Sequence, residues 1–229
     1  MEIHDCRAVM SSLPAYAELH CLSSFSFLRG ASQAEELVAR AQRLGYAALA
    51  ITDECSFAGS VRAHLAARDK PIKLIHGTEL VLVCGMKLVL LACNRAGYGN
   101  LAALVTLGRR RTEKGSYRLS RADLAGWDGG GVPDCLALWI PGVMSPAAPE
   151  TVSLADGAGD VAKEVPLVGT VIWHEQARWL AEHFAGRAWI AFERHLRPDD
   201  GERLAHLRAL AASLCLPLVA AGDVPMQVR

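Results

Sequence analysis

The sequence predicts an α/β fold in which helices cover a mainly parallel sheet. Two observations support this prediction. Short apolar segments alternate along the chain with longer segments whose apolar residues recur at helical spacing. Several of the short segments are apolar throughout, as expected for strands that are buried on both faces of a parallel sheet.

The composition is that of a globular protein. Of the 229 residues, 52% are hydrophobic and 21% are charged, so the chain can bury a core without disulfides or a structural metal. Basic and acidic residues number 24 each, and this zero net charge argues against a free-standing DNA-binding domain held by charge. Seven scattered cysteines without a C-x-x-C pair indicate reduced thiols and a cytoplasmic location. No apolar run is long enough for a membrane helix, and the first residues do not resemble a signal peptide.

Local signals predict the elements of the N-terminal half, after a loose lead-in over residues 1–15. Ser32 and Glu35 have the spacing of a capping box, which predicts a helix that Gly45 ends. Cys84 and Gly85 predict the turn of a hairpin. The strands expected here are 16–20, 47–52, 73–75, 80–83 and 87–92. The further helices expected here are 57–68 and 98–111.

The C-terminal half continues the alternation of strands and helices. The strands expected here are 136–140, 188–192 and 217–221, and the helices are 173–184 and 199–214. Residues 141–170 contain four prolines and are expected to form a long loop with at most one short helix. Arg109 to Arg111 end a helix, where cations are favoured, so they are expected to be a cap or a solvated face rather than a DNA contact.

Residues of metal-ligand type follow five of the predicted strands. In a barrel of parallel strands the carboxyl ends meet at one mouth, where active sites form. Four carboxylates and an imidazole at one place repel one another unless a positive charge lies between them. Divalent ions are the usual solution, and they activate water for phosphoester hydrolysis. Each residue alone could be a turn or cap residue, but the set together predicts a clustered site formed by His20, Asp53, Glu79, Glu193 and Asp223.

These strand-end motifs resemble the PHP domain, which is named for polymerases and histidinol phosphatases. Longer segments are similar to the N-terminus of bacterial error-prone C-family DNA polymerases, which are paralogues of the replicative alpha subunit. The segments are 18–32, 51–59, 90–101, 118–124 and 216–224. The resemblance implies a distorted (β/α)7 barrel over residues 16–229. It also implies that this chain is the front of a larger polymerase whose palm, with its magnesium ligands, lies beyond Arg229.

The same resemblance implies a metal site that this sequence has partly lost. The family's His-x-His motif has Leu22 at its second histidine, and its Thr-Asp-His motif ends in Glu54, which keeps an oxygen donor. The next family histidine falls on Lys87, and the final Asp-x-His ends in Pro225. Incomplete ligand sets lose affinity and geometry. We therefore expect a vestigial cluster with no catalytic residue and no cofactor in this domain, with residual zinc or manganese as the alternative.

Lys87 is the candidate replacement for the metal. An ammonium group at this strand start would neutralise Asp53 or Glu79 as an ion does. The alternative is a solvent-facing lysine of the hairpin. The other histidines considered, which are expected to have structural or surface roles, are His64, His76, His195 and His206.

Three functions remain open from the sequence. The first is a structural or partner-binding PHP domain of a polymerase for translesion synthesis and DNA repair, and the lost ligands favour it. The second is an active metal-dependent 3′–5′ exonuclease or phosphoesterase, and the third is a phosphoesterase unrelated to replication. For the first, the resemblance implies five partners: the rest of the polymerase chain, DNA bound through it, a Y-family-like protein, a RecA-like protein and the sliding clamp.

Overall fold

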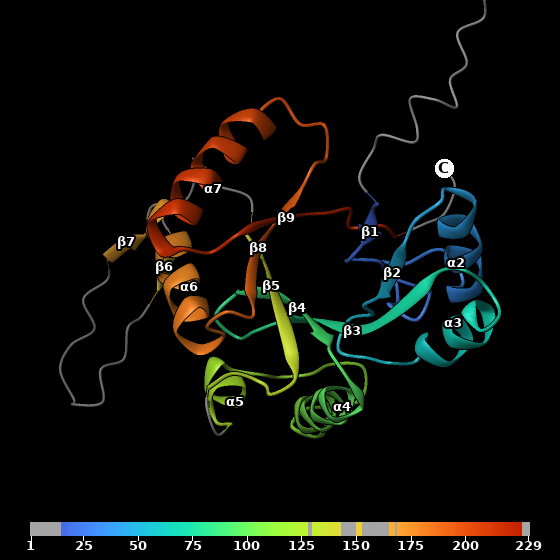
Figure 1. The fold of residues 1–229 in the computed structure, drawn as a ribbon. Coiled ribbons are helices and arrows are strands. Elements are labelled where there is room, and N and C mark those ends of the chain that lie inside the picture. Colours follow the sequence, from blue (N-terminus) through green and yellow to red (C-terminus); the bar gives the residue numbers. More distant parts are fainter. Residues whose placement is uncertain (1–14, 128–129, 143–149, 153–164, 168, 226–229) are drawn as a thin grey trace, which may run out of the picture.

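Seven strands form one curved sheet in the computed structural model, which describes residues 15–127, 130–142, 150–152, 165–167 and 169–225 (Figure 1). In sheet order the strands are β1 (Ala17–Glu18), β2 (Ala48–Ile51), β3 (Lys73–Val81), β4 (Lys87–Ala92), β5 (Cys135–Ile140), β8 (Ala188–Glu193) and β9 (Leu218–Ala221). The pairings β3–β4 and β4–β5 are antiparallel, and the other four are parallel. The mainly parallel sheet is therefore confirmed.

The two edges of the sheet meet and nearly close it into a barrel. Beyond β1 the chain stays extended, and Cys21 forms a parallel bridge with Val224 beyond β9. The Leu22 amide donates to the Val224 carbonyl at 3.0 Å, and the Val224 amide donates to the His20 carbonyl at 3.1 Å. The predicted distorted seven-stranded barrel is thus confirmed, and the segment ends that carry His20 and Asp223 are neighbours.

Helices cover the outside of the barrel, as Figure 1 shows. They are α2 (Ala34–Arg43), α3 (Ser60–Ala67), α4 (Arg95–Arg110), α5 (Arg121–Ala125), α6 (Gly169–His183) and α7 (Asp200–Leu214). A hairpin rather than a helix connects β3 to β4, so this step of the barrel contributes no helix to the outer layer. No helix in the described part of the chain is long and apolar enough to cross a membrane.

Strand β4 illustrates how the sequence divides the core. Its residues alternate between the two faces of the sheet because side chains of a strand point in opposite directions in turn. Leu88 and Leu90 are buried in the outer cluster beneath the helices, whereas Val89 and Leu91 are buried in the cluster inside the barrel. Each fully buried leucine contributes roughly 2 kcal/mol to folding. By the same alternation, Lys87 shares the inward face with Val89.

Four local predictions were wrong, and each has a physical reason. The N-cap of helix α2 is Gln33, whose backbone amide donates to the Glu36 side chain at 2.8 Å. The capping box therefore begins one residue after Ser32. Helix α4 begins at Arg95 because the Asn94 side chain accepts from the Gly97 amide. The strands expected at 73–75 and 80–83 are one strand, because its middle residues pair with β4 without a break.

The long loop expected at 141–170 is the fourth correction. Within it, β6 (Glu150–Val152) and β7 (Val165–Leu167) pair as a two-stranded antiparallel sheet, and α6 already begins at Gly169. Residues 143–149, 153–164 and 168 lie outside the described residues, as does almost all of the expected lead-in. Proline and glycine content indicates turns, but it does not exclude short strands that flank them.

Candidate functional site

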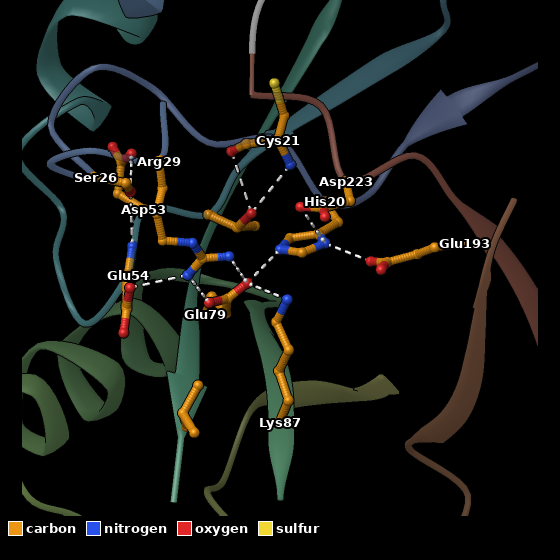
Figure 2. A network of polar contacts seen from close by, with 12 residues as sticks. His20, Cys21, Ser26, Arg29, Asp53, Glu54, Glu79, Lys87, Glu193 and Asp223 are labelled. Carbon is orange, nitrogen blue, oxygen red and sulfur yellow. Dashed lines mark hydrogen bonds and ion pairs between the residues drawn. The ribbon is translucent and has the colours of Figure 1, made fainter. Parts of the chain in front are cut away.

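His20 lies at the centre of a buried polar cluster at the mouth of the barrel (Figure 2). Its Nδ1 is 2.6 Å from Oε1 of Glu193, and its Nε2 is 2.8 Å from Oε2 of Glu79. A neutral imidazole has one N–H, so two carboxylate acceptors require the doubly protonated ring. Burial lowers the pKa of His20, but the hydrogen bonds to Glu193 and Glu79 outweigh it and raise the pKa to about 9. His20 is therefore an imidazolium at neutral pH.

Glu79 is the carboxylate on which the positive charges converge. It is fully buried at the β3–β4 hairpin, and it accepts from two nitrogens of the Arg29 guanidinium as well as from His20. The Nζ of Lys87 is 3.0 Å from Oε2 of Glu79. Burial raises the pKa of Glu79, but the bonds from His20 and Arg29 and the charge of Lys87 hold it well below its usual range. Glu79 is therefore ionised.

Strand register explains why Glu79 and Lys87 meet. Glu79 is directly opposite Val89, and Lys87 lies two residues from Val89 on the same face. Diagonal neighbours of this kind are within reach of a long side chain. Both side chains therefore point toward the interior of the barrel. The ion pair of Lys87 is with Glu79, and Asp53, the other partner considered from the sequence, has different donors.

Asp53 holds the loop that follows His20. Its carboxylate accepts from the Ser23 amide at 2.8 Å, from the Ser23 hydroxyl at 2.7 Å and from the Ser26 hydroxyl at 2.8 Å. Asp53 and Ser23 are both buried, so these bonds fix the base of the loop. The loop ends at Gly30, whose backbone packs closely against that of Ser23. A Cβ on residue 30 would lie 1.9 Å from the Ser23 carbonyl oxygen.

This loop places Arg29 beside Glu79, and Arg29 was not among the residues predicted from the sequence. The Arg29 guanidinium joins Glu79 to Glu54, with Nη1 2.9 Å from Oε2 of Glu54. Glu54 also accepts from the Tyr117 hydroxyl at 3.0 Å. The residues predicted from the sequence lie at strand ends, whereas Arg29 lies in a loop whose course depends on Asp53. No local spacing marks an arginine in such a loop as the partner of a residue fifty positions away.

The remaining candidates lie on the β8–β9 side of the mouth. Oδ1 of Asp223 is 3.7 Å from Nδ1 of His20, and Nε2 of His195 is 3.6 Å from Oε2 of Glu193. Burial raises the pKa of Glu193, but the hydrogen bond and charge of His20 lower it overall. Leu22 is buried, and the Pro225 carbonyl accepts from the Ala31 amide, so both positions now serve the packing of the chain.

The arginines at the end of α4 have internal partners. Arg109 donates to the backbone carbonyls of Cys55 and Glu54, and its guanidinium lies 5.2 Å from the ring centroid of Tyr117. Arg111 pairs with Asp123 at 2.7 Å. Arg109 therefore ties the end of α4 to the loop after β2, which is more than the expected cap or solvated face, whereas the exposed Arg111 forms a surface ion pair with α5.

Comparison with known proteins assigns the domain. The family model for the PHP domain matches residues 18–128. The chain carries a PHP domain. This stretch of the PHP domain contains His20, Asp53, Glu54, Glu79 and Lys87, whereas Glu193 and Asp223 lie outside the matched residues.

Curated relatives extend the similarity of this PHP domain over almost the whole chain. Two proteins named error-prone DNA polymerase, from Dechloromonas aromatica (strain RCB) and Azoarcus sp. (strain BH72), are 54% and 48% identical to it. The alignments cover 95% and 94% of this chain but 19% and 20% of the relatives. The chain therefore spans about a fifth of the length of the curated relatives that it matches.

Solved structures support the fold of the PHP domain. A proposed metal-dependent phosphoesterase from Bifidobacterium adolescentis matches with a TM-score of 0.55 at 15% identity, covering 94% of this chain and 90% of that one. An amidohydrolase from Chromobacterium violaceum, solved with sulfate and without metal, matches with a TM-score of 0.56 at 18% identity, covering 92% and 87%. At these identities the similarity establishes a shared fold and nothing further.

The donor chemistry of the PHP mouth tests whether a metal fits. Among the residues that the structure describes, two groups of ligand-type side chains have their ligand atoms within 4.8 Å of one another, namely His20, Glu79 and Asp223, and Glu193, His195 and Asp223. Imidazole binds metals only when neutral, and both ring nitrogens of His20 are occupied by carboxylates. Glu79 is paired with three cations. In the first group, the ligand atoms of His20 and Glu79 already have partners within the protein, and the second group includes Glu193, which is bonded to His20.

Proposed function

We propose that this PHP domain is a structural, metal-free part of an error-prone DNA-directed DNA polymerase that acts in damage-induced translesion synthesis and DNA repair. One observation carries the proposal: the buried carboxylate of Glu79 is neutralised by His20, Arg29 and Lys87. The names of the relatives support the polymerase assignment. Nucleotidyl transfer and its magnesium ions would belong to the part of those relatives that this chain does not span.

Fixed cations replace the electrostatic role of a metal but not its chemistry. Three positive groups, His20, Arg29 and Lys87, balance the charges of Glu54, Glu79 and Glu193 without an ion, while Asp53 and Asp223 add two further carboxylates. A divalent ion would also supply an open coordination position that lowers the pKa of a bound water. Ammonium and guanidinium groups have no such position. The mouth is therefore suited to hold the barrel together and not to hydrolyse a phosphoester.

The network joins segments that are distant in sequence. It connects the segment after β1 to the β3–β4 hairpin through the contacts of His20 and Arg29 with Glu79, and to the end of β8 through the contact of His20 with Glu193. Such a cross-braced barrel would give the rest of the polymerase chain, and DNA bound through it, a rigid base. We extend the proposal to a cytoplasmic location and to contacts of the whole protein with a Y-family-like protein, a RecA-like protein and the sliding clamp.

Metal analysis tests the structural role. The 229-residue chain is purified without chelator, and zinc and manganese are measured by mass spectrometry of the elements. We expect far less than one ion per chain and no change in thermal unfolding after dialysis against chelator. Near-stoichiometric zinc or manganese overturns the proposal.

An active phosphoesterase is the second candidate, and the group formed by Glu193, His195 and Asp223 favours it. The chain is incubated with end-labelled single-stranded DNA and manganese. Cleavage that is abolished by both Asp223→Asn and Asp53→Asn, but not by Asp69→Asn on an exposed turn, would establish a nuclease. We expect no cleavage above that of a heat-denatured sample.

A further inference from the structure

A second concave site lies on the outside of the barrel, away from the mouth. It is a cavity of about 570 Å³ bounded by α3, the start of β3 and the start of α4. The helical layer is open here because β3 and β4 are joined by a hairpin, which provides no covering helix between α3 and α4 (Figure 1). Lys73 at this site and Glu79 at the mouth are separated by about 20 Å of strand. The cavity and the mouth are therefore distinct.

The charges around the cavity have one sign. Its charged lining residues are Lys73 and Arg95, whereas burial lowers the pKa of His76 and keeps that ring neutral, and no acidic residue is among the described residues that line it. Arg95 is also the first residue of α4, and the positive end of the helix dipole lies at a helix N-terminus. Lys73 and Arg95 are both exposed, so their charged groups are accessible. This arrangement favours an anionic ligand.

Aromatic rings and apolar side chains form the rest of the wall. The ring of His76 neighbours those of Tyr98 and His64, with centroid separations of 5.7 Å and 6.4 Å, and it is nearly perpendicular to the Tyr98 ring. Val61 and Leu74 add apolar surface. A flat, aromatic group of a ligand can stack on such rings, and base stacking on aromatic side chains is a general mode of nucleic-acid binding.

Two buried polar atoms at the cavity have no hydrogen-bond partner within the described part of the chain. They are Oγ of Ser60, a residue that is 4% exposed, and Nδ1 of His76. Unsatisfied buried polar atoms destabilise a fold, and native structures contain few of them. Both residues line the same cavity, so rotation of their side chains would offer a hydroxyl and a ring nitrogen to a polar ligand.

We propose that this cavity binds a nucleotide, either as a free nucleoside monophosphate or as one unit of single-stranded DNA. Its phosphate would lie at Lys73 and Arg95, and its base would stack on the ring of Tyr98, with the nearly perpendicular ring of His76 at the edge of the base. The volume is within the range of small-ligand pockets and is large enough for one nucleotide. The proposal rests on the lining of the cavity and is independent of the function proposed for the mouth.

Cys93 provides a local reporter for the test. It lines the cavity and is exposed, and the exposed thiols of Cys84 and Cys215 serve as internal controls elsewhere on the surface. The chain is treated with iodoacetamide in the presence of thymidine monophosphate, oligothymidylate or inorganic phosphate, and alkylation is followed by peptide mass spectrometry. We expect the nucleotide or the oligonucleotide to slow alkylation of Cys93 several-fold and to leave Cys84 and Cys215 unchanged.

The three probes separate the possible ligands. Protection by both thymidylate probes supports binding of free and polymeric nucleotides, and protection by the oligonucleotide alone assigns the site to single-stranded DNA. Protection by inorganic phosphate equal to that by the nucleotide overturns the proposal, because the base would then contribute nothing. Unchanged alkylation of Cys93 at millimolar thymidine monophosphate and at saturating oligonucleotide also overturns it.

Charge reversal locates the phosphate. Arg95→Glu is expected to weaken binding, measured by fluorescence anisotropy of labelled oligothymidylate, by at least about tenfold. The matched control is Arg208→Glu, which reverses an exposed arginine on α7 far from the cavity and is expected to change binding less than about twofold. Circular dichroism checks that both variants are folded. Equal losses in the two variants contradict a site at Arg95.

Discussion

The Nζ atom of Lys87 lies 3.0 Å from Oε2 of Glu79, a carboxylate that has no exposed surface. An unpaired charge in this position would be costly, because a buried ion loses its hydration. The pair therefore links the start of β4 to the middle of β3 inside the barrel. The resemblance described above predicts a histidine ligand at position 87, where the structure has a cation paired with Glu79.

Removal of the Lys87 charge should destabilise the domain. Lys87→Met keeps the length of the side chain but leaves Glu79 with two cations, and we expect the free energy of unfolding in urea to fall by about 2 kcal/mol. The same change at the exposed Lys114 is the control and should have little effect. The double variant Lys87→Met, Glu79→Gln should lose less stability than the sum of the two single losses, and simple additivity of the two losses would show that the pair is not coupled.

Stability should depend on pH through His20. Its pKa is raised from 6.5 to about 9 in the folded state, so its stabilising contribution is complete below pH 6.5 and is lost as the pH rises through 9. Between pH 6 and pH 8.5 we expect a loss of about 2 kcal/mol in the free energy of unfolding. His20→Gln should remove this pH dependence, whereas His206→Gln on the surface of α7 should retain it. An identical slope in His20→Gln and the unaltered chain would contradict a protonated His20.

At acidic pH the stability of the domain should change in the opposite direction, falling as the pH falls. The pKa values of Glu79 and Glu193 are lowered below the ordinary value of 4.5, so their contribution is present above pH 4.5 and is lost as the pH falls below it. Together with His20, these carboxylates should give the cluster its greatest stabilising effect between about pH 5 and pH 6.5.

Restoring the missing histidines should create a metal site. We expect the combined variant Leu22→His, Glu54→His, Lys87→His and Pro225→His to bind zinc or manganese, and its melting temperature to fall on addition of chelator. The unaltered chain should melt at the same temperature with and without chelator. Because Leu22 is buried, circular dichroism must first show that the combined variant is folded. Chelator sensitivity in the unaltered chain would show that it already holds a metal.

Asp53 should stabilise the fold through its hydrogen bonds and without a bound metal. Asp53→Asn replaces a carboxylate that accepts from the Ser23 amide and from the hydroxyls of Ser23 and Ser26, and we expect a loss of about 2 kcal/mol. Asp69→Asn on an exposed turn is the control. The loss should be the same with and without chelator, and a loss seen only without chelator would instead assign Asp53 to a metal.

The sequence by itself determined the order of most elements of the barrel, apart from α5, and the identity of most of the mouth. Periodicity placed nearly every strand of the sheet, and the polar residue after each apolar segment identified His20, Asp53, Glu79, Glu193 and Asp223 as candidates. This was possible because strand burial and strand ends are local properties, which neighbouring residues encode. The sequence also indicated Lys87 as a neutralising cation, with Asp53 or Glu79 as its partner.

Only the tertiary structure decided how these groups are paired. It separated Asp53, which holds the loop through Ser23 and Ser26, from His20 and Glu79, and it brought Arg29 to Glu79. It also revealed the cavity between α3 and α4, which follows from a hairpin where a crossover helix would otherwise lie. Pairing depends on the register of strands and the course of loops, and both are fixed by contacts between residues that are far apart in the chain.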